Sequence, residues 1–186
     1  MKVSDRVFRL TAQVALLLTL LALSAFLLLR TYLGDEEQVW NDGAVTEVVE
    51  RGPVTIDKVT WQVESMQPYA RLADEQRKEI PVDGLTAGAV VVLVKVKLTP
   101  LDGLRMGGGG FTCEASLRDD RGNVWKSVEV FRLPLTTYCS NDDKPLKRNQ
   151  ANEVAKVFVV PASAVEHLNG IQVETRQDFR RVLITF

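Results

Sequence analysis

Histidine and cysteine are scarce in this sequence, and their scarcity limits the chemistry that the chain can perform. His167 is the one histidine among 186 residues, and Cys113 and Cys139 are the two cysteines. Two thiols and one imidazole without paired spacing make a poor zinc site, and the usual C-x-x-C redox motif is missing. The G-x-S-x-G motif that holds a hydrolase nucleophile is missing too. We therefore expect a protein that is not an enzyme and that binds no cofactor or metal.

An excess of positive charge is also lacking. The formal net charge is −1, and the residues before Asp35 include four basic side chains and one acidic one. The rest therefore has 19 basic and 23 acidic residues, a net charge of −4. Binding to nucleic acid depends on clustered Lys and Arg, so we expect no nucleic-acid partner. The apolar fraction of 46% and the charged fraction of 25% are typical of a globular protein.

One long hydrophobic run dominates the N-terminal part of the chain. Leu10–Leu29 contains twenty uncharged residues, ten of them leucine, and as a helix it would span about 30 Å, the thickness of a membrane core. Lys2, Arg6 and Arg9 precede it, and acidic residues follow it from Asp35 on. Positive charge stays in the cytoplasm. We expect a cytoplasmic N-terminus (1–9), a transmembrane helix (10–33), an acidic stalk (34–52) and an extracytoplasmic domain (53–186), in a single-pass cell-membrane protein.

A cleaved secretory signal is the alternative interpretation of the same run. Ala22 and Ser24 form a site that a signal peptidase could accept, which would leave a mature chain beginning at Ala25. That new end would be strongly apolar, and the run is longer than the 7–15 residues typical of a signal core. Both interpretations place the following domain across the membrane.

The two cysteines are predicted to form one disulfide bond. An exported domain meets an oxidising compartment, where a single pair of cysteines is usually bridged. A Cys113–Cys139 bond would close a loop of 25 residues. In the chain-entropy model this stabilises the folded state by roughly 3–4 kcal/mol.

The exported part has the alternation of β-strands. Apolar positions repeat with a period of two along most of it, and turn residues recur about every ten positions, as in a β-sandwich. In Gly88–Leu101 one face is apolar throughout, while the other begins apolar and ends with Lys95 and Lys97. The predicted strands are 45–49, 54–66 with a bulge or a turn near Asp57–Lys58, 88–101, 111–117, 124–133, 153–160, 171–175 and 181–186, with a hairpin turn at 119–123.

Two stretches are predicted to be helical. Ala70–Ile80 is highly charged and contains an Asp74–Lys78 pair at the i,i+4 spacing that stabilises helices. Ser163–Leu168 follows Pro161 and ends before Asn169-Gly170.

The sequence resembles the telokin-like, immunoglobulin-like domains of bacterial membrane-anchored proteins of unknown function. The resemblance rests on ASLRDDRGNVWKS and AKVFVVPASAVEHLNGIQVE and covers roughly Pro53–Phe186. It implies an all-β immunoglobulin-like sandwich and no reaction. The long segment Ala70–Gly88 and the cysteine pair depart from that pattern. The cysteines are closer in sequence than the inter-sheet pair of antibody domains, so we expect them to join the strand of Phe111 to the loop before Lys144.

Several other segments contain polar groups that could serve as sites. The glycine run Gly107–Gly110 precedes a strand, whereas a phosphate-binding loop precedes a helix. Loop oxygens could bind calcium but lack the D-x-D-x-D spacing, so calcium is not expected. These oxygens belong to Asp119, Asp120, Asn141, Asp142 and Asp143.

The segment Ala70–Gly88 is the strongest candidate for a binding surface, because loops of 19 residues frequently contact partners. Its candidate contact residues are Arg71, Asp74, Arg77, Lys78 and Glu79. We therefore expect a membrane-anchored binding or accessory module that contacts a protein partner in the bacterial envelope. The alternatives are a secreted binding protein, after leader cleavage, and an envelope hydrolase using His167 beside a serine or a pair of carboxylates.

Overall fold

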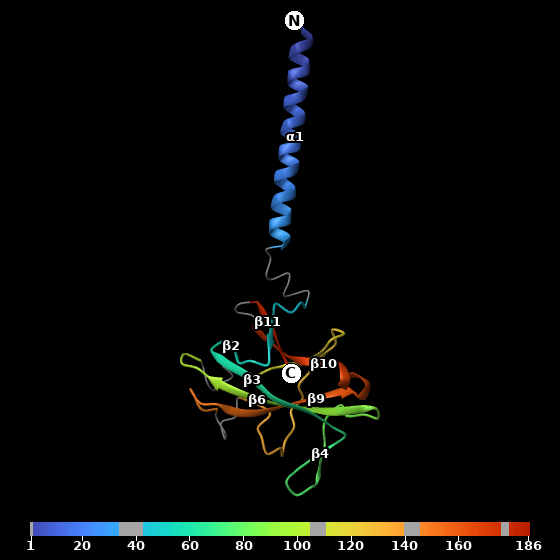
Figure 1. Cartoon of the computed structure of the whole chain (residues 1–186), viewed down its shortest axis with the longest axis vertical. Coiled ribbons are helices and arrows are strands. Elements are labelled where there is room, and N and C mark those ends of the chain that lie inside the picture. The colour runs from blue at the N-terminus through green and yellow to red at the C-terminus, as the bar shows by residue number, and fades with distance from the viewer. Residues whose placement is uncertain (1, 34–42, 105–110, 140–145, 176–178) are drawn as a thin grey trace. The chain divides into compact units, whose positions relative to one another are not determined.

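The computed structural model describes residues 2–33, 43–104, 111–139, 146–175 and 179–186. The chain divides into two compact units, Met1–Ala44 and Val45–Phe186. Figure 1 shows both units.

The first unit contains one helix, α1 (Lys2–Leu33). Its sequence has no glycine or proline and is rich in leucine and alanine, which are strong helix formers. Two of its hydroxyl groups bond back to the helix: Thr19 Oγ1 donates to the Ala15 carbonyl at 2.7 Å, and Ser24 Oγ to the Leu21 carbonyl at 3.1 Å. Large apolar side chains that are at least half exposed are Val14, Leu16, Leu17, Leu18, Leu20, Leu21, Leu23, Phe26, Leu27 and Leu28.

Over the part of the chain that the structure describes, no helix combines the length and the apolarity that crossing a membrane requires.

The second unit is a β-sandwich of two main sheets. The first sheet has the strand order β1 (Glu47–Glu50), β11 (Arg180–Thr185), β10 (Leu168–Thr175), β7 (Ser116–Asp119) and β8 (Val124–Lys126). The second has the order β2 (Val54–Ile56), β3 (Val59–Tyr69), β6 (Ala89–Pro100) and β9 (Asn152–Pro161). Strand β1 runs parallel to β11, and the other ladders are antiparallel. The predicted β-sandwich is therefore confirmed.

The hydrophobic core lies between the sheets and follows the predicted alternation. Along β6, Val92, Val94, Val96 and Leu98 are buried in this core, and along β7 Leu117 is fully buried. Of the two alternatives at Asp57–Lys58, a bulge or a turn, the structure has the turn, since both residues have positive φ and link β2 to β3. The main core residues are Val59, Trp61, Val92, Val94, Val96, Leu98, Leu117, Val154, Phe158, Ile171, Val182 and Ile184.

One predicted strand is much shorter than expected. The segment 124–133 was expected to be a single strand, but β8 ends at Lys126. Beyond it the chain leaves the first sheet: Trp125 packs against the inter-sheet core, whereas Val130 is buried in a separate cluster on the second sheet. Apolar residues continue to alternate where the chain passes from the inter-sheet core to the cluster on the second sheet. The sequence pattern therefore predicts one strand, although the two halves of the segment pack in different places.

The residues that follow, 127–139, run along the outer edge of β9, and we call them the strap. The Val128 amide donates to the Val157 carbonyl at 2.8 Å, and the Ala155 amide donates to the Thr136 carbonyl at 2.8 Å. These contacts form isolated bridges with β9 on the side away from β6. The strap therefore pairs with backbone groups at the edge of the second sheet.

Three further predictions differ in detail from the structure. Residues 111–115 are not in a strand, although Cys113, Ala115 and Leu117 are buried in the predicted alternation. The short helix after Pro161 is confirmed but is a 3₁₀ helix, η1 (Ala162–His167). Strand β1 makes residues 47–50 part of the first sheet, within the region assigned to the stalk.

Candidate functional site

The segment 70–88, which we call the arm, is a β-hairpin followed by a loop. Strand β4 (Leu72–Ala73) pairs antiparallel with β5 (Glu79–Ile80). The predicted helix over Ala70–Ile80 is therefore wrong. The Asp74 side chain accepts a hydrogen bond from the Lys78 amide at 2.8 Å, and Arg77 has a φ of 65°. Asp74 and Lys78 therefore close the turn of a β-hairpin and are not neighbours on a helix.

The apolar side chains of the arm attach it to the outer face of the second sheet. Leu72, Ile80 and Val82 are buried in a cluster with Val91 and Val157 of that sheet, and Val130 of the strap completes it. This arrangement explains why one end of the outer face of β6 is apolar and the other carries lysines. Burial of three aliphatic side chains contributes several kcal/mol of hydrophobic stabilisation, so the base of the arm is part of the fold.

The turn of the arm presents its charged residues to solvent. Arg71 forms an ion pair with Glu79 at 2.8 Å, with side chains 71% and 55% exposed, so the pair adds little stability. Arg77 and Lys78 are exposed, and Asp74 is half-buried because it serves the turn. Figure 1 shows the hairpin reaching beyond the two main sheets. Four of the five predicted contact residues are thus available to a partner.

The predicted disulfide is present. Cys113 and Cys139 are bonded, with Cα atoms 5.7 Å apart. Cys113 lies just before β7 and is 3% exposed, while Cys139 ends the strap and is half-buried. The bond therefore ties the start of β7 to the end of the strap, as the sequence spacing indicated.

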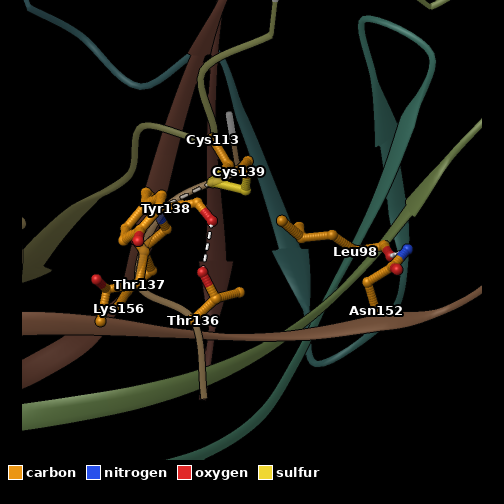
Figure 2. Close-up of a disulfide and its surroundings, with 8 residues drawn as sticks. All are labelled: Leu98, Cys113, Thr136, Thr137, Tyr138, Cys139, Asn152 and Lys156. Carbon is orange, nitrogen blue, oxygen red and sulfur yellow. Dashed lines mark hydrogen bonds between the residues drawn. A yellow bond between two sulfur atoms is a disulfide. The ribbon is translucent and has the colours of Figure 1, made fainter. Parts of the chain in front are cut away.

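A buried lysine lies against this disulfide (Figure 2). Lys156, on β9, is 4% exposed and points into the inter-sheet space. Its Nζ atom donates to the Thr137 carbonyl at 3.1 Å and lies 3.2 Å from Cys113 Sγ. The carbonyl is a good acceptor for an ammonium group, but a disulfide sulfur is a weak one. The lysine is therefore only partly compensated for the loss of water.

Burial lowers the pKa of Lys156 to about 8, and the negative charges of Glu129 and Glu114 oppose this shift. Both glutamates are exposed, so their attraction is screened by solvent. The lysine is still mostly protonated at neutral pH. An ammonium group is therefore held beside the disulfide in surroundings that solvate it poorly.

Sequence analysis missed this lysine, although a signal was present. In the predicted strand 153–160, Lys156 has the same parity as Val154, Phe158 and Val160, which are core residues. Strict alternation would therefore have placed an ammonium group between the sheets. The proximity to Cys113 could not have been inferred, because it depends on how the two sheets face each other.

The hairpin between β7 and β8 uses the buried carboxylate of Asp119 to close its turn. Asp119 accepts hydrogen bonds from the Arg121 amide at 3.0 Å, the Asn123 amide at 2.7 Å and the Asn123 side chain at 2.8 Å. Burial would raise the pKa of Asp119, but these hydrogen bonds outweigh it and hold the pKa below its ordinary value. The oxygens considered for calcium are thus engaged by the chain at this position. Within the described ranges, no group of three or more His, Cys, Asp or Glu residues could hold a metal ion.

His167 lies at the end of η1 in a charged surface cluster. Its Nδ1 is 3.4 Å from an Asp120 oxygen and its Nε2 is 3.3 Å from a Glu166 oxygen, while Arg121 also contacts the ring. These neighbours are ionic groups and not hydroxyl nucleophiles. The cluster can connect η1 to the β7–β8 turn.

Other predicted positions lie outside the described residues. These are Gly107–Gly110, Asn141, Asp142, Asp143 and the first part of the stalk, 34–42.

Comparison with known proteins provides evidence about the fold only. No family model matches the sequence, and no curated protein does. An uncharacterised β-sandwich protein from Clostridium difficile 630 is 9% identical, with a TM-score of 0.51, over 77% of this chain and 95% of its own. A conserved hypothetical protein from Bacillus anthracis is 12% identical, with a TM-score of 0.45, over 67% and 86% of the two chains. At 9% identity the first likeness shows that this chain has the fold of a β-sandwich protein.

Proposed function

We propose that the protein is a non-catalytic accessory module, anchored in the cell membrane by α1, whose extracytoplasmic sandwich binds a protein partner of the bacterial envelope through the arm. The observation that carries this proposal is the construction of the arm. Its base is packed into the fold through Leu72, Ile80 and Val82, while its turn presents mixed charge to solvent. A rigid support with an exposed polar tip is the usual arrangement of a recognition loop.

The immunoglobulin-like assignment within the β-sandwich class is part of this proposal and rests on strand order. The run β11-β10-β7-β8 has the connectivity of the G-F-C-C′ strands of variable-type immunoglobulin sheets. Strands β6 and β9 lie side by side, as the B and E strands do in those domains. The telokin-like resemblance implies the same arrangement.

The membrane anchor is supported by sequence and by the surface of the helix. Leu10–Leu29 is uncharged, its basic flank lies on the N-terminal side, and ten large apolar side chains between Val14 and Leu28 are at least half exposed. Exposure of so many leucines in water would be strongly unfavourable, and a lipid environment removes that cost.

The anchor is tested by topology and by the N-terminus of the protein from cells. A reporter that is active only outside the cytoplasm, fused after Phe186, should be active, and N-terminal sequencing should find the run Leu10–Leu29 intact. A mature chain beginning at Ala25 would instead support the secreted alternative. A reporter facing the cytosol would contradict both interpretations.

The partner surface is tested by site-specific crosslinking in intact cells. A photoreactive amino acid at Gln76, in the exposed turn of the arm, should give a discrete adduct with one envelope protein. The same label at Arg121, in the exposed β7–β8 turn, is the matched control and should not give it. Charge reversal by Arg77→Glu with Lys78→Glu should remove the adduct, whereas Lys95→Glu should leave it. Equal adducts from both turns would show that the arm is not the binding surface.

A further inference from the structure

We propose that Cys113–Cys139 is a redox-exchangeable disulfide, in which Lys156 is the charge partner of the Cys113 thiolate that reduction releases. The proposal rests on the 3.2 Å contact between Lys156 Nζ and Cys113 Sγ and on the burial of both groups. It goes beyond the binding role proposed above and does not depend on it.

The hydrogen bond to the Thr137 carbonyl offsets only part of the cost of burying the lysine, which favours an additional, chemical role. An ammonium group in the inter-sheet core costs stability, and an aliphatic side chain could fill the same volume without that cost. Reduction changes this balance, because Cys113 Sγ then carries a negative charge. The weak contact between the ammonium and a disulfide sulfur becomes a buried ion pair, which stabilises both charges. Lysine beside a cysteine lowers the pKa of the thiol, and an opposite charge at this range changes a pKa by about 1–3 units.

The two sulfurs differ in the way that such an exchange requires. Cys139 is half-buried, whereas Cys113 is buried beside the ammonium, so we expect an external thiolate to attack Cys139. Attack on Cys139 makes Cys113 the leaving group, and a thiol of lower pKa leaves faster. The carboxylates of Glu114 and Glu129 lie nearby and disfavour the thiolate, but both are exposed and screened.

The exchange is balanced with a dithiol as the co-reactant. One dithiol sulfur, as thiolate, attacks Cys139 Sγ; the S–S bond of the protein breaks, and its electron pair leaves on Cys113 as a thiolate facing Lys156. The second dithiol sulfur then attacks the mixed disulfide and releases Cys139 as a thiolate, which takes a proton. The dithiol loses two electrons and becomes a disulfide. Of its two protons, one is taken up by Cys139 and the other goes to water. With the extracytoplasmic location proposed above, the physiological reductant would be a protein dithiol outside the cytoplasm.

The proposal is tested by redox equilibration of the full-length protein in mild detergent. The protein is incubated with mixtures of reduced and oxidised dithiothreitol at pH 7, and free thiols are trapped with an alkylating reagent of high mass. Lys156→Met should lower the equilibrium constant for reduction at least tenfold, a shift of about 30 mV in the two-electron potential. Lys95→Met is the matched control and should leave the constant unchanged, since Lys95 is exposed on β6, opposite Ala155.

A second measurement keeps the proposal testable if the methionine variant folds poorly. In Cys139→Ser the remaining thiol is Cys113, and its ionisation is followed by thiolate absorbance near 240 nm. The pKa of that thiol should lie at least one unit below the ordinary value of about 8.5, and Lys156→Gln in the same background should raise it again. An equilibrium constant that is unchanged by Lys156→Met, or a Cys113 pKa at or above the ordinary value with lysine present, would overturn the proposal.

Discussion

Replacement of Lys156 by methionine should remove a specific dependence of stability on pH. Methionine has a similar length and no charge, so it keeps the packing between the sheets. In the unfolded chain the lysine holds its proton up to its ordinary pKa of 10.5, whereas in the folded protein it loses the proton at about 8. Between these values the unfolded state binds more protons, so the stability of the wild type rises with pH.

The magnitude follows from the width of that interval. Each pKa unit corresponds to about 1.4 kcal/mol, so between pH 7 and pH 10 the wild type should gain about 2–3 kcal/mol that the variant does not gain. Near pH 7 the variant avoids the cost of burying an ammonium group but loses the hydrogen bond to the Thr137 carbonyl, worth about 1–3 kcal/mol. The two stabilities should therefore be similar at pH 7, and the wild type should be the more stable at pH 10.

The assay is urea unfolding of the oxidised full-length chain in nonionic detergent, followed by tryptophan fluorescence, to which the buried Trp61 contributes. Other groups that titrate over this range are common to both proteins and cancel in the difference. Lys95→Met serves as the control and should follow the wild type. A difference between wild type and Lys156→Met that changes by less than about 1 kcal/mol from pH 7 to pH 10 would refute the argument.

Three further substitutions test the fold around the proposed sites. In Gly170→Ala the new Cβ would lie 2.2 Å from the Ile184 carbonyl oxygen, so the β10–β11 pairing must shift. We expect a loss of roughly 3 kcal/mol or more in thermal or urea unfolding. Ile80→Ala should cost about 2–4 kcal/mol because it empties part of the cluster under the arm, whereas Val124→Ala, at an exposed position, should cost little. Asp119→Ala should cost about 2–3 kcal/mol through the loss of three hydrogen bonds. That cost should shrink as the pH falls below the ordinary carboxyl range. The carboxylate of the wild type then becomes protonated and loses the stabilisation that its hydrogen bonds provide.

The elements that were predicted correctly are those in which the local sequence pattern and the packing favour the same structure. Residues 88–101 alternate because the inner side of β6 meets the core throughout, and the hairpin at 119–123 was predicted because Asp, Gly and Asn favour a turn. In both cases local preference and tertiary packing agree, so the sequence alone is sufficient.

The arm failed as a prediction because its pattern fits two structures. Asp74 and Lys78 are four residues apart, which suits a helical ion pair, but the same spacing lets the Asp74 carboxylate cap a four-residue turn. Leu72 and Ile80 are likewise spaced for one helical face, yet both contact the outer face of the second sheet from paired strands. The hairpin is selected because its apolar side chains pack on the outer face of the second sheet, whose residues are distant in sequence.

The pairing of the strap with β9 has a consequence for how copies of the protein meet. A strand at the border of a sheet leaves amide and carbonyl groups that a strand from another molecule can join, which is a common route to aggregation. Here Val157 and Ala155 already bond to residues of the same chain, and the bridge at Cys139 holds the end of the strap beside them. A strand from another molecule could therefore join the second sheet at this border only by displacing the strap.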